Sequence, residues 1–385
     1  MDGNSIGLLA GIGPLCTDLY LPALPQISAK LNTSASLVQF SLTATLLGIA
    51  LGQIFIGPSS DSIGRKKPLL LSLLLFIIAT FMCSFAASIG QLIFFRFLQG
   101  IAGAGGIVLS RAIACDLYTG PELTKFFSLL MLVNGVAPIF SPVIGGQLLA
   151  LFDWKGIFFA LGIFSILLTA AVIFGAKESL PIEQRNAQGL KATLTTFGRL
   201  LSDASFVGYL LIQGFIIAGL FAYIAGSPFV LQTIYGLSAN TFSLCFAANG
   251  MGIMLFAQLT GYFTGKFDET QLLVFGLTLS LGCSVLLLAM TIIKVSLAFI
   301  LVQLFFIVSS IGITTTAGFS LALQRQTHSA GSATGLLGVV SFIFGAIASP
   351  LVGLGNTMTA IPMGLVITIA NAFAFISYFK LARAE

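Results

Sequence analysis

Two charged residues stand inside long apolar stretches. Asp18 belongs to Thr17-Asp18-Leu-Tyr20-Leu-Pro22-Ala-Leu-Pro25, and Arg96 begins Arg96-Phe-Leu-Gln99-Gly100. An ionisable group inside a membrane usually faces a cavity or a partner, and burial and nearby charges can tune a carboxyl group to bind and release protons. The two residues therefore predict a proton-coupling site. A static Asp18–Arg96 ion pair, or an Arg96 side chain that reaches up to the outer interface, are the alternatives.

The composition requires a lipid environment. Of the 385 residues, 57% are hydrophobic and only 8% are charged, whereas a soluble domain carries about 25% charged residues. The apolar runs show no alternation of period two, which excludes a transmembrane barrel, so they are expected to be helices. A span needs roughly 20 residues. We predict an all-α integral membrane protein with twelve spans, at about 5–28, 35–57, 68–88, 91–115, 124–151, 155–176, 205–228, 238–264, 270–292, 296–323, 332–355 and 359–380.

The basic residues predict how the chain is oriented. With the first terminus in the cytoplasm, the outer loops hold only Lys30, Lys155 and Lys294, and this asymmetry places both termini inside, in the cytoplasmic (inner) membrane. The start, Met1 to Ser5, lacks a basic region, so we expect the first span to be retained. The inner side then carries Arg65, Lys66, Lys67, Lys125, Lys177, Arg185, Lys191, Arg199, Lys266, Arg325, Lys380 and Arg383.

Two halves of the chain resemble each other. Ser141-Pro142-x-x-Gly145 recurs as Ser349-Pro350-x-x-Gly353, and Pro22 and Gly57 recur in a similar way as Pro228 and Gly261. The shared spacing suggests a parallel duplication, as in transporters with two related halves. We predict two pseudo-symmetric six-helix bundles, residues 1–176 and 205–385, joined by a cytoplasmic linker, residues 177–204.

Two further motifs combine glycine with polar or bent backbone. The segment Gly57-Pro-Ser-Ser-Asp61-Ser-Ile-Gly64-Arg65-Lys66-Lys67 lies between the second and third spans, and Gly64 suits a tight turn. Asp61 needs a compensating partner there, because a carboxylate at a helix C-terminus opposes the helix dipole. The alternative is an ordinary positively charged inner loop. The second motif predicts a bent, closely packed fifth span, and it consists of Asn134, Gly135, Pro138, Ser141, Pro142, Gly145 and Gly146.

These segments resemble the major facilitator superfamily. The loop resembles the family signature Gly-x-x-x-Asp-Arg-x-Gly-Arg-Arg/Lys, with Ser62 in place of the first Arg. The resemblance implies that Asp61 helps to latch one conformation by meeting the start of the helix at Ala330–Thr334. It implies a latch made of Gly57, Asp61, Gly64, Arg65 and Lys66, which Arg111 and Asp116 can join.

Three more segments carry the resemblance to one branch of that family. Arg96-x-x-Gln99-Gly100 is similar to a fourth-helix motif associated with proton transfer, and the fifth-span motif is similar to that of antiporters, with Ser141 in place of the usual Gly. Asp18-x-Tyr20-x-Pro22-x-x-Pro25 resembles twelve-span drug–proton antiporters of the bicyclomycin and chloramphenicol resistance type. Some relatives have a second acidic residue where this chain has Ala10, which leaves Asp18 as the predicted proton site.

The remaining candidates concern the substrate. Polar side chains in the spans predict a cavity lined by Tyr20, Gln99, Asn134, Tyr223 and Asn249, and the 36 Phe residues suit lipophilic solutes. The five Cys residues are scattered and His328 is the single His, so neither a metal site nor a disulfide framework is expected. No nucleophile–base constellation suggests an enzyme.

The sequence therefore predicts a monomeric, proton-coupled exporter of lipophilic small molecules or drugs. It is expected to use the proton as coupling ion, to need no cofactor and to bind no nucleic acid. Two alternatives stay open. One is a proton-coupled exporter or symporter of a dedicated metabolite such as a siderophore, and the other is a membrane sensor that transports nothing.

Overall fold

The computed structural model describes residues 9–118, 120–175, 178–185, 189–293, 295–324, 326, 330–354 and 359–382. Within these ranges the chain is helical, and the one β-bridge is an isolated contact between Thr264 and Phe267. Several residues named above lie outside the described residues: Lys177, Lys294, Arg325, His328 and Arg383. The side chains of Lys125 and Lys191 do so as well.

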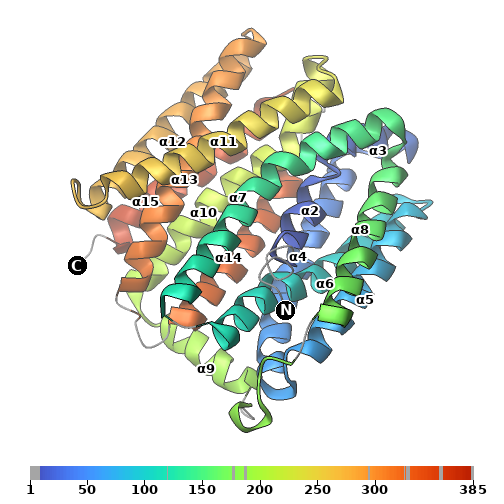
Figure 1. The fold of residues 1–385 in the computed structure, drawn as a ribbon. Coiled ribbons are helices and arrows are strands. Elements are labelled where there is room, and N and C mark those ends of the chain that lie inside the picture. Colours follow the sequence, from blue (N-terminus) through green and yellow to red (C-terminus); the bar gives the residue numbers. More distant parts are fainter. Residues whose placement is uncertain are drawn as a thin grey trace. The chain divides into compact units, whose positions relative to one another are not determined.

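The chain groups into two units, and each is described by itself. The first comprises residues 1–33 and 44–194, and the second comprises residues 34–43 and 195–385. Figure 1 shows the helices of both in chain colours. The first unit contains α2 (Ile12–Asp18), η1 (Leu21–Ala23), α3 (Leu24–Lys30), most of α4 (Ala35–Ile63), α5 (Lys66–Ser84), α6 (Ile89–Leu117), α7 (Gly120–Leu151), α8 (Trp154–Gly175) and η2 (Ile182–Gln184).

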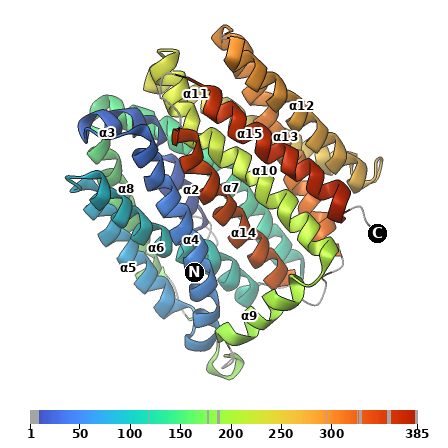
Figure 2. The ribbon, with the colours of Figure 1, turned by 180° about the vertical axis from the view of Figure 1, so that it is seen from behind.

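The second unit is likewise built mainly of long helices. It contains α10 (Ala204–Pro228), the π-helical η3 (Phe229–Ile234), α11 (Ala239–Phe263), α12 (Glu269–Ile293), α13 (Leu297–Gln324), α14 (Ala330–Leu351), η5 (Val352–Leu354), α15 (Ile361–Ser377) and the π-helical η6 (Tyr378–Ala382). Seen from behind, α10 lies between α14 and α15 (Figure 2). The first residues of α4 also belong to this unit, because Gln39 Nε2 donates to the Ala225 carbonyl at 3.0 Å.

Eleven of the described helices are long and apolar enough to cross a membrane. The remaining predicted span, the first in the chain, is a broken helix. Its part α2 ends at Asp18, and η1 and α3 follow after a turn at Leu19 and Tyr20. Proline at the start of η1 and α3 removes a backbone donor from each turn, which accounts for the break. The all-α membrane fold with twelve spans is thus confirmed.

Glycine sets the packing between helices of the first unit. A Cβ at Gly100 of α6 would overlap the carbonyl oxygen of Thr45, and one at Gly48 of α4 would overlap that of Phe97. Only hydrogen can occupy these places, so the backbones of α4 and α6 approach each other closely. This contact sets the position of α6 along α4, and therefore the position of Arg96 within the unit.

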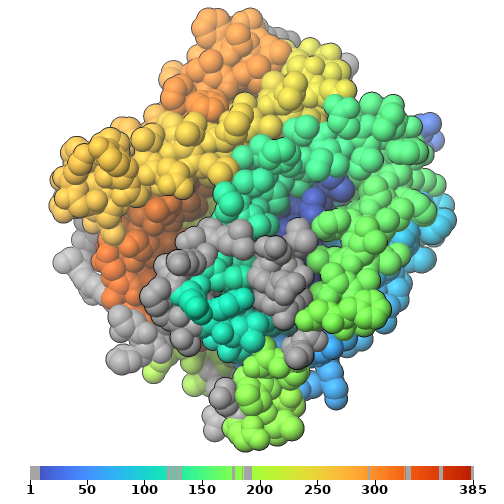
Figure 3. All heavy atoms as spheres, in the orientation of Figure 1, coloured from blue at the N-terminus to red at the C-terminus, as the bar shows by residue number. Residues whose placement is uncertain are grey.

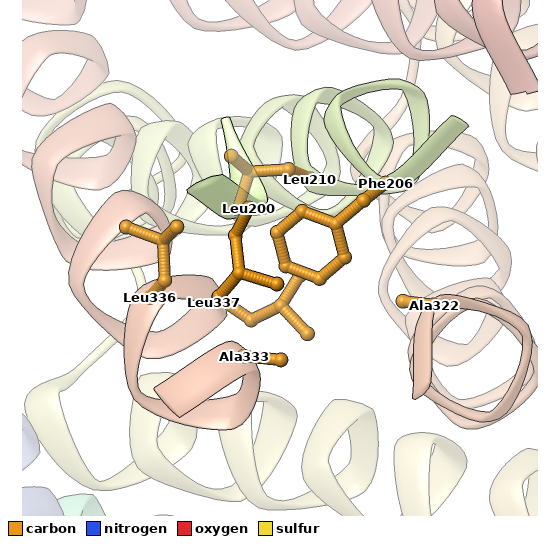
Figure 4. Close-up of a cluster of buried hydrophobic side chains, with 7 residues drawn as sticks. All are labelled: Leu200, Phe206, Leu210, Ala322, Ala333, Leu336 and Leu337. Atoms are coloured by element: carbon orange, nitrogen blue, oxygen red, sulfur yellow. The ribbon is translucent and has the colours of Figure 1, made fainter. Parts of the chain in front are cut away.

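The linker contains a helix that the sequence reading did not predict, α9 (Gly189–Leu200). Its last residue, Leu200, packs with Phe206 of α10, Ala322 of α13 and Ala333 of α14 (Figure 4). Asp203 caps α10 by accepting from the backbone N–H of Ser205 at 3.0 Å, and Gln326 Nε2 donates to the same carboxylate at 2.8 Å. The end of the linker is therefore an integral part of the second unit.

Candidate functional site

Asp18 is the last residue of α2 and lies at the break in the first span. It is 6% exposed, and no ion pair within 4.0 Å involves it among the described residues. The partial negative charge of a helix C-terminus does not compensate a carboxylate. Asp18 is thus a buried carboxyl group whose charge no contacting cation balances.

Arg96 interacts electrostatically with Asp18 but does not contact it. Its guanidinium is fully buried, and Nη1 donates to the Cys16 carbonyl at 2.8 Å and to Gln99 Oε1 at 2.5 Å. The carbon Cζ lies 4.1 Å from the centre of the Tyr20 ring, a cation–π contact. The guanidinium is held by neutral groups inside the unit. Arg96 therefore neither forms a static ion pair with Asp18 nor reaches up to the outer interface.

Gln99 and Tyr20 both support Arg96. Gln99 is fully buried, and its Nε2 donates to Thr80 Oγ1 at 2.7 Å while its Oε1 accepts from Arg96. The Tyr20 ring is 1% exposed, and its centre lies 5.6 Å from that of Phe158. These two predicted cavity residues face the interior of the first unit, and they fix the position of the arginine.

The glycine- and proline-rich helix α7 packs against the break beside Asp18. Gly145 and Gly146 are buried, and a Cβ at Gly145 would overlap the carbonyl oxygen of Leu19. Ser141 donates to the Ala137 carbonyl at 2.6 Å within the helix, and Pro142 is buried next to it. The motif residues Asn134, Gly135 and Pro138 are half-buried. The motif therefore brings the α7 backbone directly to the residue that follows Asp18.

The second unit contributes a separate polar pair. Asn249 Nδ2 of α11 donates to the Tyr223 hydroxyl of α10 at 2.8 Å, and both residues are buried. The Phe246 ring stacks on Tyr223 with 5.5 Å between centres. Two residues from the predicted substrate set thus meet in an aromatic environment.

The loop between α4 and α5 forms a charged cluster around Arg65. Its guanidinium pairs with Asp61, one helical turn earlier, and with Asp116 of α6, with Nε 2.9 Å from Oδ2. Burial by itself would lower the pKa of Arg65, but the hydrogen bonds that it donates to Asp116 and Asp61 prevail and raise it. Asp61 thereby gains the compensating cation that its place requires. Arg111 forms no ion pair within 4.0 Å in the described part of the chain and stays outside this cluster.

The linker residue Glu178 completes the cluster, and the sequence reading missed it. Its carboxylate accepts from the backbone N–H of Arg65 at 2.7 Å and of Lys66 at 3.3 Å, at the start of α5. Gly64 has φ of +104°, and a Cβ there would lie 2.6 Å from Glu178. Burial by itself would raise the pKa of Glu178, but backbone hydrogen bonds lower it. The signal available in the sequence was an acidic residue directly after a span.

Known proteins resemble the chain along its whole length. Residues 6–350 match the Major Facilitator Superfamily. The chain belongs to this superfamily. A Bacillus subtilis relative, "Uncharacterized MFS-type transporter YdgK", is 43% identical over 98% of this chain and 94% of its own length. The "Bicyclomycin resistance protein homolog" of Haemophilus influenzae is 29% identical over 98% and 95%.

A solved structure shares the fold of this superfamily member. It is a bacterial homolog of the human lysosomal transporter Spinster, with a TM-score of 0.78, 17% identity and coverage of 99% of this chain and 97% of that one. The superfamily and the transporter neighbours establish a membrane transporter and not an enzyme. The expected meeting of Asp61 with the start of α14 concerns two different units and stays a prediction.

Proposed function

We propose that this transporter exports lipophilic small molecules in exchange for protons, and that Asp18 binds the proton. The observation that carries the proposal is the Asp18 carboxyl group at the break in the first span, which is 6% exposed and contacts no cation among the described residues. The relative named for bicyclomycin resistance supports the direction and the substrate class.

The residues around Asp18 suit a site that gains and loses a proton. Arg96 supplies a positive charge that acts on Asp18 electrostatically, while its own hydrogen bonds go to Cys16 and Gln99. A direct pair would hold the carboxylate in its charged form. In the proposed cycle, Asp18 takes a proton from outside as substrate leaves, and releases it to the cytoplasm before substrate binds again.

The energetics are sufficient for export. For a neutral substrate, a proton that moves inward across 100 mV releases about 2.3 kcal/mol, which supports a concentration ratio of roughly 50-fold. Asp18 is the proposed proton site, so one proton per cycle is the expected stoichiometry. Alternating access requires the two predicted bundles, residues 1–176 and 205–385, to rock about the site.

Reconstituted full-length protein tests the proposal. Proteoliposomes loaded with ethidium, as a lipophilic cation, are given a pH gradient of either sign. Antiport predicts that substrate moves against the proton flow in both cases. Movement in the same direction would show a symporter, and flux of none among a panel of lipophilic compounds would favour a dedicated metabolite as substrate.

A further inference from the structure

A cavity of about 810 Å³ lies wholly within the second unit, away from Tyr223 and Asn249. It is a half-open cavity between α10, α12, α13 and the last helix, α15 with η6. Two of these helices begin beside it and two end beside it, so it lies at one end of the unit. Figure 3 shows the projecting corner between the end of α11 and the start of α12.

The lining of the cavity is ordered by depth. On α10, α12 and α13 the lining residues nearest the helix ends are polar and form the rim: Ser205, Thr270, Gln271 and Gln324, whereas the end of η6 contributes the apolar Ala382. The residues one helical turn further into the unit are apolar or aromatic, among them Val274, Phe275 and Leu321. Phe275 is 59% exposed. The cavity therefore changes from polar to apolar in the direction in which a bilayer does.

The charges beside the rim are of both signs. Glu269 stands directly before Thr270, and its carboxylate accepts from Ser320 Oγ at 3.0 Å and from the rim residue Gln324 at 2.7 Å. Asp203 accepts from the backbone N–H of Ser205. The exposed Lys380 stands in η6, between the lining residues Phe379 and Ala382 along the chain. Lys266 is turned to Tyr262, with Nζ 3.1 Å from the hydroxyl.

We propose that this cavity binds the headgroup and glycerol region of an aminophospholipid. The ammonium group lies toward Glu269 and Asp203, and the phosphate lies toward the rim amides and Lys380. The acyl chains pass over Val274 and Phe275 into the bilayer. A volume of this size is in the range of sites for small organic ligands, which suits a headgroup and glycerol but leaves the chains outside.

The matching place in the first unit is occupied by the chain itself. By order along the chain, α5, α6 and α8 correspond to α12, α13 and α15. Between the start of α5 and the end of α6, Glu178 accepts from Arg65 and Lys66, and Ser179 Oγ donates to Asp116 at 2.9 Å. Leu180 is 7% exposed there. A segment with polar and apolar groups fills that place in one unit, and a lipid would supply both kinds of group in the other.

Native mass spectrometry of the purified full-length protein tests the proposal. The probe is an equimolar mixture of phosphatidylethanolamine and phosphatidylglycerol in detergent. We expect one retained phosphatidylethanolamine. Val274→Trp fills the apolar floor and should lower its retention about tenfold, equivalent to roughly 1.4 kcal/mol. Val285→Trp, on an exposed part of the same helix, is the matched control and should bind as the native protein does.

A second variant distinguishes a lipid headgroup site from an apolar groove that binds without headgroup selectivity. Glu269→Gln removes the charge but keeps a hydrogen-bonding side chain, so it should reduce the preference for phosphatidylethanolamine over phosphatidylglycerol. Glu183→Gln, exposed in η2, should leave the preference unchanged. Equal retention of the two lipids by the native protein, or undiminished retention by Val274→Trp, would overturn the proposal. Val274-dependent binding of ethidium without phosphatidylethanolamine would do so too.

Discussion

Arg96 is a buried cation held by neutral groups. One nitrogen, Nη1, contacts both the Cys16 carbonyl and Gln99, while the plane of the guanidinium lies over Tyr20. Spacing alone could suggest Asp18 as its partner, because the two charges stand out in apolar sequence. It could not show that a backbone carbonyl and the side-chain amide three residues away would take up Nη1 of the guanidinium.

Arg96→Lys tests whether the geometry of this cation matters beyond its charge. Lysine keeps the charge but loses the planar guanidinium that stacks on the Tyr20 ring. We expect transport to fall about tenfold or more, corresponding to roughly 1.4 kcal/mol or more of lost stabilisation. Initial flux in proteoliposomes measures it, and Arg199→Lys on the exposed face of α9 is the matched control. Native flux in Arg96→Lys would contradict this role.

The contribution of Glu178 to the stability of the folded protein depends on pH. Its pKa is lowered in the folded protein, so its contribution to stability is complete at neutral pH. That contribution declines as the pH falls below its ordinary value of 4.5 towards the lower folded value. We therefore expect Glu178→Gln to have a lower melting temperature than the native protein at pH 7 and a smaller difference near pH 4.

Glu183→Gln is the control for that pH series, because this carboxylate is exposed. It should follow the native protein at each pH. A constant difference between Glu178→Gln and the native protein from pH 7 to pH 4 would show that the carboxylate charge does not cap α5.

At the scale of helices, the contact between α7 and the broken first span is the tightest link between two sequence motifs. A Cβ at Gly145 would overlap the carbonyl oxygen of Leu19, directly after Asp18. The glycine and proline pattern predicted close packing and a bend, but a pattern within one helix does not name the neighbouring backbone. The prolines of the first span likewise did not reveal a break at Asp18 to Tyr20.

Gly145→Ala should force α7 away from the break. Overpacking in a close-packed interior typically costs about 1–3 kcal/mol, so we expect a lower melting temperature and reduced flux. Gly282→Ala is the matched control, because no atom lies within 4 Å of a Cβ at that helical position. A native melting temperature and flux in Gly145→Ala would show that the contact can relax without consequence.

At the scale of the whole molecule, the sequence predicted nearly every span. Eleven long helices begin and end within a few residues of the predicted ranges, because hydrophobic length and charge both mark helix ends in a membrane. The linker was predicted as a polar segment, and it contains α9 and the Glu178 contact. Those features depend on partners more than a hundred residues away, which local patterns do not encode.

The orientation of the chain is a prediction at the same scale. In a variant without native cysteines, Asp153→Cys lies in a predicted outer loop and Ser62→Cys lies in a predicted inner loop; both positions are exposed. A membrane-impermeant maleimide should label Asp153→Cys in intact cells and Ser62→Cys only after permeabilisation. The reverse pattern would place the termini outside.

Proton movement coupled to substrate through Asp18 can be measured in proteoliposomes. Substrate added to proteoliposomes without a pH gradient should drive protons the opposite way, which an internal pH-sensitive dye records. We predict that Asp18→Asn abolishes this proton movement while still exchanging labelled for unlabelled substrate, and that Glu183→Gln behaves as the native protein does. Substrate-driven proton movement at the native rate in Asp18→Asn would contradict the account.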